Sequence, residues 1–351
     1  MHRLAHRIVL VALNCGLAGL VALPAWAQSG ATPPSSARAW ADLRAIADSL
    51  AGPSMPVTAP GFDPIVDAGR GALEAYLRAS LTGKTARADS VLTDCRLAAT
   101  AVEKLYGSPF LQSCLGVVTR LTPDQARGWL RADSLGTAGS RQARTAPDSA
   151  RATLGEASAL YFSVGDSLFG GRYAGIRTIM DRAAEPSEQI AALKRVAKDA
   201  ARRGDLTVKA GAYMSQASAL RSADTPDTIV ACHMRAAEIH ERIKDAARLL
   251  ADWVSIGGTY WNRKRYGEAR AAYQHSIDLG TGSPRMVVAV LTKLSGCWSV
   301  LGRPDSAMVF ARRSLDIARR ENLPAETAWA LTSIGETLSA QGQADSAIAY
   351  D

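Results

Sequence analysis

Cysteine and aromatic residues are scarce in this chain, and their scarcity narrows the classes of protein it can belong to. Only five of the 351 residues are cysteine, and aromatic residues make up 6%. No two cysteines form a Cys-x-x-Cys pair, so zinc sites and thioredoxin-type sites have no support. Runs of β-branched and aromatic residues that would predict strands are also missing. Alanine, leucine and arginine are abundant instead, and this composition predicts an all-α protein.

Sequence motifs of the common enzyme classes are missing as well. The chain has no HExxH, EF-hand loop or glycine-rich dinucleotide turn. Gly83-Lys84-Thr85 has the end of a phosphate-binding loop, but Arg78 stands where the first glycine belongs. His233 and His240 lie seven residues apart on one predicted helix, about 10 Å by helical rise, too far to share a metal ion. We expect both to be partly buried polar side chains, and we expect no metal and no cofactor.

One tetrapeptide resembles the nucleophile block of GDSL-type esterases: Gly165-Asp166-Ser167-Leu168, after an apolar stretch. Such an enzyme also needs a later Gly-x-Asn-Asp and an Asp-x-x-His to activate its serine. Neither follows, so we expect no catalytic residue and no esterase activity from Ser167. The small residues Gly165 and Ser167 instead indicate a helical hairpin that turns at Gly170-Gly171.

The N-terminus carries the one long apolar run. Arg3 and Arg7 precede the run Ile8–Leu23, and Ala25-Trp26-Ala27 places small residues at the two cleavage positions. This pattern predicts a secretory signal peptide over 1–27 and an exported chain, periplasmic or secreted. The alternative is an uncleaved anchor, although the run is shorter than the roughly 20 residues that a spanning helix needs.

The charge of the chain is mildly basic. The formal net charge is +8, and it falls to +6 without residues 1–27, which contain two arginines and no acid. Over this length the surplus predicts no nucleic-acid surface. No other segment is apolar enough to span a bilayer, so we expect no membrane span after signal cleavage. The sequence gives no oligomeric state.

Four cysteines follow the predicted signal peptide: Cys95, Cys114, Cys232 and Cys297. Cys95 and Cys114 lie on consecutive predicted helices that turn near Gly107-Ser108-Pro109, so an oxidising compartment would allow them to bridge. The alternative is that all four are small buried hydrophobic residues.

Apolar spacing and polar breaks divide the chain into six predicted segments. They are a signal peptide at 1–27, a linker with one helix near 37–50 at 28–64, a helical region at 65–135, a polar linker and domain boundary at 136–149, a divergent helical repeat region at 150–205, and repeats at 206–351, the last incomplete.

The repeats show as three lines that can be superimposed: 252–273, 290–311 and 330–351. Each has a small residue at one position, Gly257, Ser295 or Gly335, at spacings of 38 and 40 residues. An alanine follows twelve residues later in every line. Antiparallel helices approach closely only where side chains are small, so each line predicts a helical hairpin. Turn glycines end the first helix in two lines, whereas the first line has Lys264 there, and we expect its turn to close differently.

These lines resemble the tetratricopeptide repeat (TPR) in a longer form. The resemblance is carried by Trp253, Ile256, Gly257, Tyr260, Tyr266, Ala269 and Tyr273, covers roughly 140 residues, and includes a degenerate repeat near 206–244. It implies an α-α superhelix of stacked hairpins with a concave groove lined by the first helix of each repeat. It also implies that the exposed run Arg263-Lys264-Arg265 is a turn between two helices and not a functional basic patch.

Groove positions of the family fall on small, apolar or neutral residues here. They are Ala251, Val254, Gly258 and Trp261 in one repeat, Ala289, Thr292, Gly296 and Ser299 in the next, and Trp329, Thr332, Glu336 and Ser339 in the last. The lysine and asparagine clamp of chaperone-binding members is absent. Trp261 and Trp329 are the predicted partner anchors, because aromatic residues dominate interface energetics. The alternative is that each tryptophan packs against the neighbouring repeat.

Two functions remain open at this point. The first is a non-catalytic exported scaffold that binds a protein or peptide in the groove. The second is the N-terminal regulatory arm of a larger enzyme, since TPR arrays behind signal peptides resemble parts of CHAT-type proteases and sensor kinases. The last hairpin has barely two turns of its second helix, so we expect a longer natural protein and fraying of residues 343–351.

Overall fold

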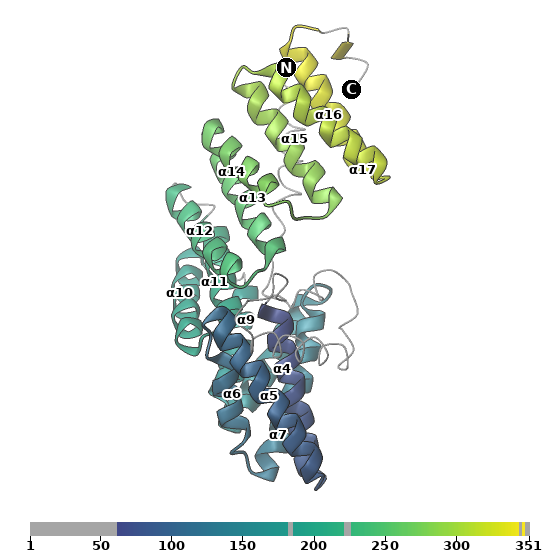
Figure 1. Ribbon diagram of the computed structural model, residues 1–351. Coiled ribbons are helices and arrows are strands. Elements are labelled where there is room, and N and C mark those ends of the chain that lie inside the picture. The colour runs from purple at the N-terminus through teal and green to yellow at the C-terminus, as the bar shows by residue number, and fades with distance from the viewer. Residues whose placement is uncertain (1–61, 182–184, 221–225, 344–345, 348–351) are drawn as a thin grey trace. The chain divides into compact units, whose positions relative to one another are not determined.

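The described residues form helices joined by short turns and contain no strand (Figure 1). A computed structural model describes residues 62–181, 185–220, 226–343 and 346–347. The predicted signal peptide, the helix near 37–50 and most of 343–351 lie outside this range. Within it, the prediction of an all-α protein built from helical hairpins is confirmed.

The chain divides into two compact units. Unit 1 covers the chain up to Ala219 together with Arg242–Lys244, and unit 2 covers Leu220–Glu241 and Asp245–Asp351. We had expected a domain boundary at 136–149, and the division falls elsewhere. The helices assigned to unit 1 are α4 (Phe62–Leu81), α5 (Thr85–Tyr106), α6 (Phe110–Val118), α7 (Pro123–Gln142), α8 (Pro147–Ser163), α9 (Ser167–Met180), α10 (Pro186–Arg203) and α11 (Leu206–Leu220, apart from the last residue).

The linker predicted at 136–149 is wrong, because α7 continues to Gln142 and α8 begins at Pro147. Glycines misled the prediction, since glycine weakens an isolated helix. Here the glycines allow close packing: a Cβ on Gly136 would lie 2.3 Å from the Tyr173 ring, and one on Gly139 2.8 Å from Leu154 Cγ. Because these glycines have no side chain, Tyr173 and Leu154 can pack directly against the backbone of α7. This tertiary packing outweighs the low helix propensity of glycine.

Helix starts in unit 1 follow local sequence signals. Proline occupies the first turn of α7, α8 and α10, where its missing N–H breaks no helical bond. Thr122 and Gln125 form a reciprocal capping box at the start of α7. The 20-residue helix α7 thus continues past residue 135, the predicted end of the helical region, and α4 begins slightly earlier than the predicted boundary at residue 65.

The core of unit 1 is an aromatic cluster from four helices. Trp129 meets Tyr161 and Phe169 edge to face at 5.5 and 5.8 Å between ring centroids. Tyr161 stacks on Phe169 at 5.5 Å and on Tyr173 at 5.7 Å, and Phe110 meets Phe169 edge to face. Edge and offset contacts of this kind add to the free energy gained from burial alone.

Unit 2 contains the strongest sequence repeats. Its helices are α12 (Pro226–Arg242, apart from the last residue), α13 (Ala246–Asn262), α14 (Tyr266–Asp278), α15 (Pro284–Val300), α16 (Pro304–Arg320) and α17 (Pro324–Ala340). Helices adjacent in sequence pack as antiparallel neighbours from α13 to α17, and α17 also packs against α15. The first helices of the last two predicted repeats, α15 and α17, thus lie side by side.

One turn geometry closes most of the hairpins. In each case a residue with positive φ follows the helix, and the next N–H donates to the carbonyl five residues back. Arg265 N donates to Tyr260 O at 3.0 Å, as Arg303 N does to Trp298 O at 2.9 Å. We had expected the turn at Lys264 to close differently from the one at Gly302, and this is wrong, because Lys264 adopts φ 59°. The same turn follows Gly83, so Gly83-Lys84 links α4 to α5.

Small residues twelve apart mark the helix crossings. Gly257 lies under Tyr273, whose Cε1 would be 2.5 Å from an added Cβ. Ser295 occupies the matching position in the next hairpin, and its hydroxyl donates to Ala307 O at 2.9 Å. Ser158 donates in the same way to Gly170 O, again twelve residues later, at 2.8 Å.

The hairpin α8–α9 therefore has the geometry of the repeats. It turns at Gly165, with φ 87° and the same backbone bond from Asp166 N to Tyr161 O. The turn predicted at Gly170-Gly171 is wrong, since both glycines are buried inside α9. The glycine of the crossing was mistaken for the glycine of the turn.

All four cysteines in the described part of the chain are free and buried. The predicted turn between α5 and α6 is present, but the bridge from Cys95 to Cys114 is not. Cys95 lies eleven residues before the end of α5, about 16 Å along its axis, whereas Cys114 lies about 6 Å into α6. A disulfide needs Cα atoms within about 7 Å, so the alternative of small buried residues holds.

Candidate functional site

The predicted binding positions fall on α13, α15 and α17 and differ in exposure. Val254, Gly258 and Trp261 on α13 and Thr292 and Ser299 on α15 are half-buried. On α17 the predicted positions are exposed: Trp329, Thr332 and Glu336. The exposed part of the predicted site is therefore concentrated on the last described first helix.

Trp261 packs against the neighbouring hairpin. A Cβ on Gly296 of α15 would lie 3.3 Å from Trp261 Cη2, so the indole rests on that glycine. Its ring also meets Tyr266 edge to face at 5.1 Å. The packing alternative thus describes the position of Trp261, and Gly296 is the small residue that accommodates it.

Thr292 is used inside its own hairpin. Its hydroxyl lies 3.0 Å from Ser314 Oγ of α16 and donates to Val288 O at 3.0 Å. Ser314 is fully buried. The contact with Ser314 joins α15 to α16 and orients the Thr292 side chain toward the hairpin interior.

Trp329 has no comparable cover. It is 43% exposed, and tryptophan is the largest of the exposed apolar side chains among the described residues of unit 2. Its neighbours on the same face, Thr332 and Glu336, are exposed too. An exposed indole surrounded by small or polar groups combines a large apolar area with few rotatable bonds, and such residues dominate binding energies in protein interfaces.

Unit 2 also exposes apolar residues that the sequence analysis did not single out. Most of the exposed large apolar residues in the described chain lie there: Met286, Val300, Leu301, Val309 and Trp329, against Leu97 and Phe162 in unit 1. Val309 is the most exposed, at 63%. Scattered apolar residues are normal on a soluble surface, and the helical period does not say which of them a neighbouring helix covers.

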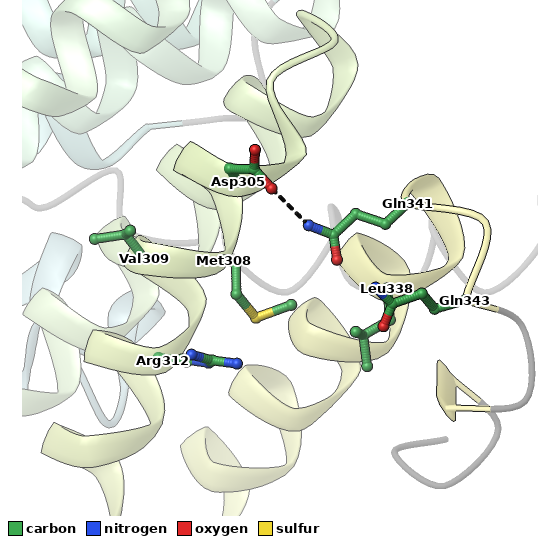
Figure 2. Close-up of a pocket in the computed structure, with 7 residues that line it drawn as sticks. All are labelled: Asp305, Met308, Val309, Arg312, Leu338, Gln341 and Gln343. Carbon is green, nitrogen blue, oxygen red and sulfur yellow. Dashed lines mark hydrogen bonds between the residues drawn. The ribbon is translucent and has the colours of Figure 1, made fainter.

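A hollow of about 340 Å³ lies between α16 and α17 (Figure 2). Met308 and Val309 of α16 and Leu338 of α17 line its apolar part. Polar residues complete the lining: Asp305, Arg312, Gln341 and Gln343. The Gln341 amide donates to Asp305 Oδ1 at 2.9 Å and joins the two helices at one end.

His233 and His240 converge on one carboxylate. His240 Nδ1 lies 2.6 Å from Asp252 Oδ2, and His233 Nδ1 lies 3.7 Å from Asp252 Oδ1. All three side chains are buried, which corrects our expectation of partly buried histidines. The distance along α12 is large, but both side chains reach toward α13. No group of three or more metal-ligating side chains suited to an ion occurs among the described residues.

The GDSL tetrapeptide is a capped helix start. Asp166 is fully buried, and its Oδ1 accepts from the N–H of Leu168 and of Phe169 at 3.0 and 3.1 Å. Its Oδ2 accepts from Trp129 Nε1 at 2.9 Å. Ser167 is exposed in the first turn of α9, and residues 62–219 contain no histidine. Serine hydrolases of this type activate the serine with a histidine base, so this turn lacks that arrangement within residues 62–219.

Buried charge in unit 1 is paired. Arg70 Nη1 donates to both carboxylate oxygens of Asp133 at 2.7 Å, and the Tyr161 hydroxyl donates to Asp133 Oδ1 at 3.1 Å. Burial raises the pKa of the Asp133 carboxyl, while the Arg70 charge opposes that shift. Arg172 pairs with the fully buried Asp205 at 2.6 Å. These groups are enclosed among helices, so they cross-link the core.

The basic run 263–265 is also tied to its neighbours. Arg265 pairs with Asp227 at 2.8 Å and Glu268 at 2.9 Å, and its guanidinium lies over the Tyr260 ring at 4.7 Å. Lys264 supplies the backbone conformation of the turn. Within the described chain, no helix is long and apolar enough to cross a membrane.

Comparison with known proteins adds little to this geometry. No protein-family model matches the chain, and no curated protein matches it. Among solved structures it is similar to the crystal structure of BtubC (BKLC) from P. vanneervenii, at 16% sequence identity and a TM-score of 0.38, covering 64% of this chain and 87% of that chain. A TM-score this low supports no inference, so fold and function are argued from this chain's own residues.

Proposed function

We propose that the protein is an exported, non-catalytic scaffold of TPR-like hairpins that binds a protein segment. The observation that carries the proposal is Trp329, 43% exposed on a first helix of the array. Thr332 and Ser339 on the same face are exposed and small, and they leave the backbone of a bound segment room to approach. The indole supplies the anchor, and binding buries its exposed area.

The other groove positions take a supporting part in this proposal. Trp261 and Thr292 are occupied by packing and hydrogen bonds within unit 2. Trp261 packs between two first helices and Thr292 joins α15 to α16, so their substitution acts on stability before it acts on binding. The regulatory-arm function would use the same face, and the binding test applies to both.

A selection from random peptides displayed on phage tests the binding face directly. Peptides are selected on the 351-residue chain and then measured on Trp329→Ala. We expect selected peptides to lose at least about tenfold in affinity on that variant, as for an interface hot spot. Phe162→Ala, which removes a 50% exposed aromatic from unit 1, is the matched control and should change affinity little. Equal binding to wild type and Trp329→Ala would contradict the proposed face.

Export is tested by mass. Expressed with its own N-terminus in a bacterium, the chain should appear outside the cytoplasm with a mass that begins at Gln28. A product that retains residues 1–27 would contradict the proposed processing.

A further inference from the structure

The hollow between α16 and α17 lies on the side of α17 opposite to Trp329. Leu338, which lines the hollow, is nine residues after Trp329, and nine helical steps turn the side chain by about 180°. Leu338 is 9% exposed and Met308 8%, and both belong to one apolar cluster with Ile334. The hollow is therefore a surface separate from the proposed binding face.

The preceding interface between two hairpins, α14 against α15, shows what fills the corresponding place. Leu338 comes three residues after the crossing residue Gly335, as Trp298 does after Ser295. Met308 follows the crossing alanine Ala307, as Arg270 follows Ala269. At that interface the Arg270 guanidinium of α14 lies over the Trp298 ring of α15 at 4.9 Å. Between α14 and α15 the Trp298 indole and the Arg270 guanidinium fill this space. Between α16 and α17 the smaller Leu338 and the flexible Met308 leave it open.

Charge gives the hollow two different ends. Arg312 lines one end and makes no ion pair with any described residue. Asp305 lines the other end, about 10 Å away along α16, and accepts from Gln341. Val309, 63% exposed, extends the apolar surface beside Arg312. An incoming carboxylate is attracted at the Arg312 end and repelled at the Asp305 end.

We propose that this hollow is a second docking site, which takes an aromatic side chain of a partner protein with an acidic residue two positions away on the Arg312 side. The ring rests on Met308 and Leu338, and Arg312 both covers the ring face and pairs with the carboxylate. A lysine in place of the acid meets the Arg312 charge and is rejected.

Methyl NMR of the 351-residue chain with ¹³C-labelled methionine tests the site, with the Met308 signal assigned from Met308→Leu. The probes are three capped pentapeptides: Ala-Trp-Ala-Glu-Ala, Ala-Trp-Ala-Lys-Ala and Ala-Ala-Ala-Glu-Ala. We expect the first to shift the Met308 methyl with an affinity about two- to fivefold higher than the second, as for one exposed ion pair. The third peptide should leave Met308 unshifted.

Three variants distinguish binding in the hollow from nonspecific peptide binding. Arg312→Glu should reverse the preference between the first two peptides, whereas Arg313→Glu, an equally exposed arginine outside the hollow, should preserve it. Leu338→Trp imitates Trp298 and should abolish the Met308 shift while the helical circular dichroism is kept. If Leu338→Trp unfolds, the two arginine variants decide alone.

Several outcomes would overturn the proposal. An unshifted Met308 methyl with all peptides means that the hollow is closed or too shallow. Equal shifts by the glutamate and lysine peptides mean that Arg312 selects nothing. A shift that depends on protein concentration without peptide means that a second copy of the chain is the occupant.

Discussion

The two units hold their helices together with different residues. Unit 1 buries a cluster of aromatic rings and a polar network, in which Arg70 pairs with Asp133 and the Trp129 indole donates to Asp166. Unit 2 relies more on small residues at helix crossings, such as Gly257 and Ser295, with aliphatic and single aromatic side chains such as Tyr273 around them. A polar network in a core demands that each member keep its partner, whereas a crossing of small residues demands only that they remain small.

This difference bears on where binding takes place. A repeated crossing repeats the same helix face in each hairpin, and its outward residues are left open to vary. Unit 2 uses that freedom to expose Trp329 on one side of α17, while the hollow with Arg312 lies on the other. Unit 1 has its large aromatic residues inside and exposes Phe162 and Leu97 among its large apolar residues.

The largest effect is expected from breaking the polar network of unit 1. Asp133→Ala leaves the Arg70 guanidinium and the Tyr161 hydroxyl without their shared acceptor. Removal of one partner from a buried pair costs about 3–5 kcal/mol, which urea unfolding of unit 1 should report. Asp124→Ala, which removes an exposed carboxylate paired with Arg127, should change stability by less than about 0.5 kcal/mol. Similar effects of the two variants would contradict the role given to the network.

A smaller effect is expected at the crossing in unit 2. Gly257→Leu places a branched side chain where even a Cβ meets Tyr273 at 2.5 Å, and such overpacking costs about 1–3 kcal/mol. The adjacent Gly258 is a matched control, because its Cβ would meet the nearest atom, Tyr273 Oη, at 3.7 Å. Gly258→Ala should be neutral or stabilising by up to about 1 kcal/mol through helix propensity. The two melting temperatures measure this, and the opposite order would place the crossing elsewhere.

At the turn, replacing Lys264 by glycine is expected to raise the stability of unit 2. Lysine at φ 59° bears a steric cost of roughly 1–2 kcal/mol that glycine avoids. Lys264→Gly should therefore stabilise unit 2 by about 1 kcal/mol or slightly less, since glycine also adds freedom to the unfolded chain. Gly302→Ala, at the matching turn, should destabilise. A loss of stability in Lys264→Gly would mean that the lysine side chain contributes more than its backbone costs.

The smallest expected effect is that the buried cysteines of the native chain are not alkylated. Burial raises the pKa of the Cys95 and Cys297 thiols to about 12, and that of Cys114 well above its ordinary value. The reactive thiolate is then scarce at pH 8, so iodoacetamide should leave the native chain unmodified. After denaturation without reductant, all four cysteines from Cys95 onward should be alkylated. Alkylation of only two would show a disulfide.

The sequence predicted most of unit 2 because its packing rule is local. Gly257 and Ala269 are twelve residues apart and recur at a fixed spacing, so the helices, the crossings and the all-α class follow from a single chain. The sequence could not predict which groove side chains a neighbouring helix buries. Trp261 and Trp329 both occupy groove positions of the family, but Trp261 packs on Gly296 of α15, whereas Trp329 is exposed.

Unit 1 was harder to predict because its partners are distant in sequence. Arg70 and Asp133 are 63 residues apart, and Trp129 and Asp166 are 37 apart. No periodic pattern connects such pairs. The glycines at 136 and 139 gave a misleading local signal, since their use depends on Tyr173 and Leu154 from other helices. In unit 2 the convergence of His233 and His240 on Asp252 was missed because the rise along one helix does not show that both side chains reach toward the next helix.

The central claim is that unit 2, through Trp329, contacts the partner and unit 1 does not. Site-specific photo-crosslinking in the producing cell tests it with a photoreactive phenylalanine analogue placed at position 329 or, as the matched exposed aromatic of unit 1, at position 162. We predict that position 329 forms a discrete crosslinked protein band and that position 162 forms none. The same band at both positions, or a band at 162 alone, would contradict the claim.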